Sequence, residues 1–211
     1  MPYVTSTVSE SWARIDAWLR THAPASFHVL APPADPDAVE KAQTDMGLRF
    51  PPDLLDSLAC HDGQIKWANI FPERPPAPVA EIVSFWRMSV DIAGDDPDLC
   101  EPHEEGGEPW WHAQWIPWAH SDSDAQVIDM REGPDQGRVG SSQHDDTATF
   151  EGGWPSLSAY LKHVADVLDH GGTVGPWAPY LTSGGELWWS FEGQTVLNGS
   201  PLTPAPTSQD I

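Results

Sequence analysis

The chain is poor in positive charge. Its 211 residues include 10 Lys and Arg against 32 Asp and Glu, which gives a formal net charge of −22. A field of this sign repels nucleic acid and anionic membrane surfaces, and it attracts basic partners. The same excess of acids can also serve solubility alone. We therefore expect a protein partner, and neither nucleic acid nor a membrane.

Cysteines and long apolar runs are also scarce. The two cysteines, Cys60 and Cys100, form no CxxC pair, which argues against a disulfide framework and fits reduced thiols. No apolar run approaches the roughly 18 residues that a transmembrane helix needs. Residues 1–10 contain neither a basic residue nor an apolar run, so we expect no secretory signal. Together these absences predict a cytoplasmic protein.

Motifs of common enzymes and metal sites are missing. The sequence has no glycine-rich nucleotide loop, no GxSxG and no HExxH. Its histidine clusters are turns that begin at His61, His120 and His144. Asp122 and Asp124 start like a calcium loop, but the glycine that should follow is absent. Solvated turn residues explain these clusters better, so we expect no catalytic residue, no metal and no cofactor.

Acidic residues are concentrated in the second part of the chain. Residues 1–90 carry 11 acids and 7 bases, a net charge of −4, whereas residues 91–211 carry 21 acids and 3 bases, a net charge of −18. The densest stretch, at 95–108, has no Lys or Arg and is followed by two tryptophans. We predict that this acidic loop steers a basic partner, which the tryptophans anchor. The candidate binding residues are Asp95, Asp96, Asp98, Glu101, Glu104, Glu105, Glu108, Trp110 and Trp111.

Tryptophan is unusually common. Four of the twelve tryptophans fall in the segment Trp110–Ala119, which reads W-W-H-A-Q-W-I-P-W-A. A packed tryptophan buries about 150–250 Å², so this segment is costly to leave in water. We expect it to lead into a central strand that helices cover, with Pro117 at a strand start or edge. An exposed aromatic patch for a partner is the alternative.

The spacing of apolar residues predicts the secondary structure. Helices are expected to start near Val8, Pro36, Pro52, Val79 and Pro155, with Trp18 half exposed at the edge of the first. Strands are expected at 64–70, 126–130, 139–143, 147–150 and 186–191. Helices followed by strands and a last helix favour an α+β fold over a doubly wound sheet.

This order of elements divides the chain into three parts. We predict a domain over residues 8–172, then an extension over 173–197 with an edge strand. The Pro/Ser/Thr-rich residues 198–211 are expected to form a disordered tail.

The run from Leu48 to Leu58, followed by the turn His61-Asp62-Gly63, resembles the hallmark of the SUKH superfamily and is most similar to its Smi/Knr branch. In that branch a G-x-x-hydrophobic-P turn precedes a short helix that ends at a His/Asn/Asp-Gly turn. The matching residues are Gly47, Phe50, Pro51 and Gly63. Trp115–Ala119 is similar to the W-I-P-F-A segment of the branch, with Trp118 replacing Phe. The acidic loop and the chain beyond Gly172 depart from the pattern.

The resemblance implies an α+β fold in which helices flank a central, mainly antiparallel sheet, and a role without catalysis. Its motif residues serve turns and the core. Bacterial members are often immunity proteins that neutralise toxins, whereas the fungal member is a regulator of cell-wall assembly. The leading hypothesis is therefore an immunity-type protein that neutralises a basic toxin, for instance a nuclease. A scaffold or regulator is the second hypothesis, and an enzyme or metal protein that uses the His/Asp turns is the third.

Overall fold

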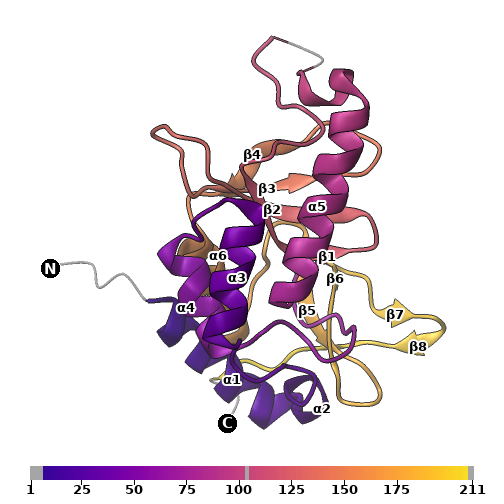
Figure 1. Ribbon diagram of the computed structural model, residues 1–211. Helices are drawn as coiled ribbons and strands as arrows, with labels where there is room; N and C mark the ends of the chain where they lie inside the picture. The colour runs from indigo at the N-terminus through magenta and orange to yellow at the C-terminus, as the bar shows by residue number, and fades with distance from the viewer. Residues whose placement is uncertain (1–6, 103–104, 209–211) are drawn as a thin grey trace, which may run out of the picture.

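The computed structural model describes residues 7–102 and 105–208 and has an α+β fold, which confirms the predicted class (Figure 1). The helices are α1 (Val8–His22), α2 (Pro24–Phe27), α3 (Pro36–Met46), α4 (Pro52–Cys60), α5 (Val79–Asp95), the 3-10 helix η1 (Pro97–Cys100) and α6 (Leu157–His170). The strands are β1 (Trp115–Ser121), β2 (Asp124–Asp129), β3 (Val139–Ser142), β4 (Thr149–Trp154), β5 (Trp177–Leu181), β6 (Leu187–Phe191), β7 (Val196–Leu197), β8 (Ser200–Pro201) and β9 (Thr203–Pro204).

The main sheet is an antiparallel meander with the strand order β1-β2-β3-β4. β1 was expected at the centre, but it lies at the edge of this sheet. Its outer edge is covered by the extended, proline-rich segment 75–77. Ala77 N donates to the Trp118 carbonyl oxygen (2.9 Å), and His120 N donates to the Pro75 carbonyl oxygen (3.2 Å). The edge is therefore closed by a segment whose prolines rule out a longer strand.

Local signals set the helix ends. Thr7 and Glu10 form a capping box at the start of α1. Asp35 caps α3, and Gly47 ends it in the left-handed conformation (φ 66°). Both helices therefore start where the sequence predicts, near Val8 and Pro36.

The tryptophan-rich segment is part of the core, so the packing interpretation is confirmed. Trp118 packs with Phe71 and Tyr160 in the cluster beneath α1, α4 and α6. Trp111 and Trp115 lie in a second cluster under α5, and their ring centroids are 5.9 Å apart. These three tryptophans are at most 2% exposed. The alternative of an exposed aromatic patch is therefore wrong for them.

Two local predictions are wrong. Residues 64–70 form no strand, because the Gln64 side chain bonds both backbone groups of Ala68 and closes a local loop. Trp18 is 2% exposed rather than half exposed. Its indole Nε1–H donates to the carbonyl oxygen of Pro206 (3.0 Å), so the C-terminal segment covers it.

The C-terminal extension packs on the domain. β6 is a strand as predicted, but it belongs to a second sheet with the order β6-β5-β9. The expected disorder is wrong for residues 198–208. Thr203 pairs with Leu181, Leu202 is buried, and Ser208 N donates to the Asp169 carbonyl oxygen (3.0 Å). The segment is ordered because it covers apolar surface and pairs with a strand; residues 209–211 lie outside the described residues.

None of the described helices combines the length and the apolar composition that crossing a membrane requires.

Candidate partner-binding surfaces

The acidic loop follows α5 and lies at the top of the view in Figure 1, beyond the C-terminal end of that helix. Several of its carboxylates face solvent, and within the described residues they form no ion pair: Asp95, Asp96, Asp98, Glu101 and Glu105. Asp96 also caps η1 by accepting from Asp98 N (3.2 Å). The predicted residue Glu104 lies outside the described residues. The exposed acids are available for an incoming cation, and their binding role stays a prediction.

Glu108 differs from the rest of the loop because it faces inward. Its carboxylate pairs with Arg131 (2.8 Å) and Arg138 (2.7 Å). Both arginines also pair with Asp129, whose side chain is 4% exposed. Burial acts to raise the pKa of Asp129, but the bonds that Arg131 donates outweigh burial and hold this pKa below its ordinary value. We therefore remove Glu108 from the candidate binding residues and assign it to an internal ion cluster.

The internal ion pairs leave the net charge of the second part of the chain unchanged, but they engage its few bases. Residues 91–211 have three bases. Arg131 and Arg138 belong to the ion cluster, and Lys162 Nζ lies 2.6 Å from Asp166 Oδ2. Each of these bases is thus already paired with an acid, and among the residues that the structure describes no base forms an ion pair with the exposed acids of the loop.

The two tryptophans after the loop differ in exposure. Trp111 is 2% exposed and contacts Phe85 and Trp115, so its proposed contact with a partner is wrong for this conformation. Trp110 is half-buried, and its indole N–H donates to the His144 carbonyl oxygen (3.0 Å). Only part of the Trp110 ring is left for an outside contact.

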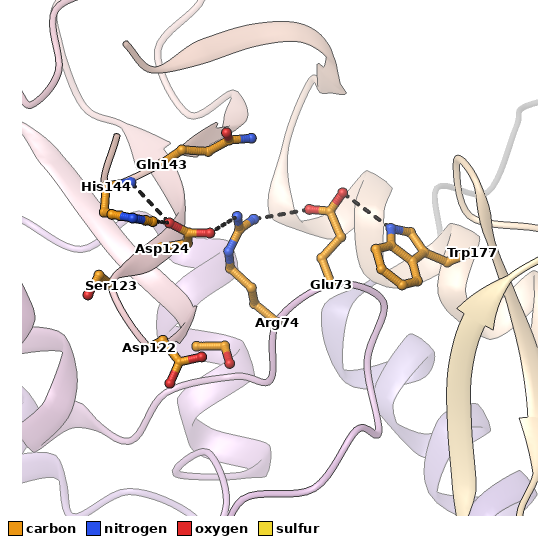
Figure 2. A pocket seen from close by; sticks show the side chains of 9 residues that line it. Glu73, Arg74, Asp122, Ser123, Asp124, Gln143, His144 and Trp177 are labelled. Atoms are coloured by element: carbon orange, nitrogen blue, oxygen red, sulfur yellow. Dashed lines mark hydrogen bonds and ion pairs between the residues drawn. The ribbon is translucent and has the colours of Figure 1, made fainter. Parts of the chain in front are cut away.

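A cavity of about 430 Å³ lies where the turn between β1 and β2 meets the C-terminal extension. Figure 2 shows the Arg74 guanidinium between two carboxylates. It lies 3.3 Å from Asp124 and 3.1 Å from Glu73, and Glu73 in turn accepts from the Trp177 indole N–H (3.3 Å). His144 N also donates to Asp124 (3.0 Å). The extension therefore supplies one wall of the cavity through Trp177.

The charges in this cavity are linked. The bond to Asp124 and the nearby charge of Asp145 raise the pKa of the exposed His144. Burial acts to raise the pKa of Asp124, but the bonds from His144 and the charge of Arg74 outweigh it and lower this pKa. Arg74 is 8% exposed and forms ion pairs with both Glu73 and Asp124. A free anion would therefore meet a neutralised arginine rather than an open positive site.

The histidine turns have structural contacts. His61 Nδ1 lies 2.7 Å from the Ala31 carbonyl oxygen and Nε2 lies 3.1 Å from Asp16, while Asp62 accepts from Val79 N at the start of α5 (2.7 Å). His120 stacks on Phe85 (5.0 Å between ring centroids). Within residues 7–102 and 105–208, no group of three or more His, Cys, Asp or Glu side chains is placed to hold a metal ion.

Sequence reasoning missed three residues that line this cavity. Glu73 and Arg74 belong to the segment before α5, and Trp177 belongs to the C-terminal extension. Glu73 and Arg74 precede a proline run, and Trp177 is more than 100 residues away in sequence. The sequence feature that could have indicated this cavity is the Asp122/Asp124 turn, which starts like a calcium-binding loop.

The sequence model of the SMI1 / KNR4 family (SUKH-1) matches residues 33–163, which is more than half of the chain. The chain belongs to this family. The matched residues run from the segment before α3 into α6, so they include the main sheet and the acidic loop. The segment from Gly47 to Gly63 and the segment Trp115–Ala119, on which the resemblance rested, both lie inside the match. α1 and the C-terminal extension lie outside it.

A curated fungal protein shows the same relation over a short stretch. The KNR4/SMI1 homolog of Yarrowia lipolytica (strain CLIB 122 / E 150) is 36% identical over 63 residues. These residues make up 30% of this chain and 9% of the relative. The similarity thus covers a small part of a much longer protein.

Proposed function

We propose that this chain is a non-catalytic protein-binding domain of the cytoplasm that neutralises a basic toxin domain, as immunity proteins do. The observation that carries the proposal is the unbalanced acidic loop. Its exposed carboxylates have no ion-pair partner among the described residues, and each of the three bases of residues 91–211 already pairs with an acid outside the exposed loop carboxylates. Electrostatic complementarity of this kind raises association rates with basic partners.

Two further observations support the proposal. The SMI1 / KNR4 family includes immunity-type members, and this chain belongs to the family. Cys60 and Cys100 are free thiols, as expected of a protein that works in a reducing compartment. A nuclease is a suitable toxin, because proteins that act on nucleic acid need basic surfaces.

The direct test is protection of growth. A toxin domain encoded beside this gene is expressed in a bacterial host with and without the chain. We expect the toxin to stop growth alone and growth to recover when the chain is present. A neighbouring toxin that stays lethal in the presence of the folded chain refutes the proposal.

The role of the loop is tested by association kinetics with that toxin. In the loop variant, Asp95, Asp96 and Asp98 become Asn, and Glu101 and Glu105 become Gln. The matched control removes the same charge from exposed acids elsewhere, namely Asp37, Glu40, Asp56, Glu132 and Asp135. Stopped-flow association at low salt should slow by about tenfold in the loop variant and much less in the control. Equal rates in the two variants would show that net charge, and not the loop, directs the encounter.

A scaffold or regulator of cell-wall assembly is the second candidate. The observation that favours it is the match to the KNR4/SMI1 homolog of Yarrowia lipolytica. This role predicts several host partners at the cell envelope and no toxin gene beside this one. Affinity purification from the native host with a high-salt wash separates the two proposals. A single basic protein that the salt releases supports the toxin-neutralising role.

A further inference from the structure

Three hollows that share lining residues lie along the loop 64–69, the proline-rich segment before α5 and the turn between β1 and β2. The first, of about 110 Å³, lies between the loop 64–69 and β6. The second, of about 190 Å³, shares Lys66 and Trp67 with it and extends along the proline-rich segment before α5. The third is the 430 Å³ cavity of Figure 2, which shares Ser121 and Asp122 with the second. We call these three neighbouring hollows together the Trp67 groove.

The groove contains the most exposed large apolar side chains of the described residues. Ile65 is 67% exposed and Trp67 is 61% exposed, two positions apart on one loop. Trp67 meets the half-buried Trp188 edge to face, with 6.0 Å between ring centroids. Leaving a tryptophan exposed to water beside a second aromatic ring is energetically unfavourable, and such patches mark interaction sites. Tryptophan is also among the residues most enriched at interface hot spots.

The groove is acidic around this apolar centre. The three hollows are lined by five carboxylates, Glu73, Glu81, Asp122, Asp124 and Glu186, against two bases, Lys66 and Arg74. Arg74 is already paired with Glu73 and Asp124. Asp122 has no ion pair among the described residues, and it lines both the second and the third hollow.

The backbone at two acidic positions of the groove is strained. Glu73 (φ 63°) and Asp122 (φ 53°) adopt the left-handed conformation, which non-glycine residues rarely adopt. Their carboxylates line the same cavity. Residues in such conformations cluster at binding and catalytic sites, where the surrounding structure holds them in place.

We propose that the Trp67 groove binds an extended, basic segment of a protein partner. Trp67 and Ile65 would contact apolar side chains of that segment, and Asp122 and the carboxylates near it would bind its Lys or Arg side chains. An extended segment suits a set of neighbouring hollows, because alternate side chains of an extended chain point to the same side. Charge complementarity selects a basic partner over an acidic or neutral one.

The inference rests on the proposed function only in taking the partner to be a basic protein. The groove lies at the N-terminal end of α5 and the acidic loop begins at its C-terminal end, and a 17-residue helix is about 25 Å long. The two surfaces are therefore separate and can be altered one at a time.

The test uses the full chain and labelled peptides of about ten residues, which span about 33 Å when extended. In one peptide every second position is alternately arginine or leucine with serine between, and the control peptide has glutamine in place of arginine. We expect the arginine peptide to bind in fluorescence anisotropy at low ionic strength. Trp67→Ala should weaken its binding about fivefold or more, while Met88→Ala, at an exposed apolar residue on α5, should change it less than about twofold.

Charge and position are checked separately. Asp122→Asn should weaken binding more than Asp135→Asn, which removes the same single negative charge from an exposed turn residue. In NMR spectra, the indole N–H signals of Trp67, Trp177 and Trp188 should shift with peptide, whereas the buried Trp111 should not.

The inference is overturned if the arginine peptide does not bind, or if Trp67→Ala weakens binding no more than Met88→Ala. The outcome is distinguishable from failure of the proposed function. Specific peptide binding without protection from a toxin leaves the groove standing and removes the immunity role. Protection by the Trp67→Ala variant, together with peptide binding insensitive to Trp67, removes the groove and leaves the immunity role.

Discussion

The ion cluster at the base of the acidic loop gives a sharp stability prediction, tested by Asp129→Asn. The Asp129 carboxylate accepts from Arg131 N (3.1 Å) and Arg131 Nε (2.9 Å), and it also accepts from Arg138 Nε (3.1 Å). Asparagine keeps the shape, but it removes the charge and turns a donor toward the arginines. Removing one partner of a buried pair costs about 3–5 kcal/mol.

The expected loss is smaller than this range, for two structural reasons. Glu108 still accepts from both arginines, and the Arg131 and Arg138 side chains are 29% and 28% exposed, so water partly compensates. We therefore expect Asp129→Asn to lower the free energy of unfolding at pH 7 by about 2–3 kcal/mol. Urea unfolding, monitored by tryptophan fluorescence, measures this change in the free energy of unfolding. The control variant Asp135→Asn should stay within about 0.5 kcal/mol of the parent.

The pH dependence of this difference has a definite sign. The folded state holds the pKa of Asp129 below its ordinary value, so the carboxylate contributes stability above its unfolded pKa of about 4. That contribution is lost as pH falls through the folded pKa. The gap between the parent and Asp129→Asn should therefore shrink as pH falls below about 4. A loss below about 1 kcal/mol at pH 7, or a gap that stays constant on acidification, refutes the reasoning.

Two further predictions concern His61 and Gly63. Burial acts to lower the pKa of His61, but the contacts with Asp16 and the Ala31 carbonyl outweigh it and raise this pKa. The parent should therefore have a higher free energy of unfolding than His61→Gln below about pH 6.5, and this difference should fade as pH rises through the folded pKa of His61. Urea unfolding at a series of pH values measures the difference. A Cβ on Gly63 would lie 2.4 Å from Pro78 N, whereas one on Gly47 meets nothing within 4 Å. Gly63→Ala should thus lower the melting temperature well beyond Gly47→Ala, which costs about 1 kcal/mol; equal losses would contradict the contact.

The elements that the sequence predicted are those with local causes. The capping box at Thr7, the Asp35 cap and the left-handed Gly47 depend on neighbours within a few residues, and the helices begin and end there. The segment with Trp110, Trp111, Trp115 and Trp118 was assigned to the core because large aromatic area has to be buried, although the first two were also named as partner contacts. Of these four, only Trp110 keeps part of its ring at the surface.

The elements that the sequence missed depend on distant contacts. Trp18 lies at the edge of an apolar stripe, and nothing near it indicates that Pro206 accepts its indole N–H. Glu108 looked like one more loop carboxylate, because its partners Arg131 and Arg138 come 23 and 30 residues later. The groove combines a loop, a hairpin turn and the extension, and each of these segments alone is unremarkable in sequence.

The contact between Trp18 and Pro206 also orders events during synthesis. The first helix leaves the ribosome early, but the carbonyl that satisfies its indole N–H is made 188 residues later. Likewise, the Asp169 carboxylate that accepts from Arg14 is made 155 residues after this arginine. Since translation adds about 5–20 residues per second, α1 spends on the order of ten seconds or more with a tryptophan and an arginine unpartnered. The apolar face of α1 around Trp18 is therefore completed only after residue 206 has been made.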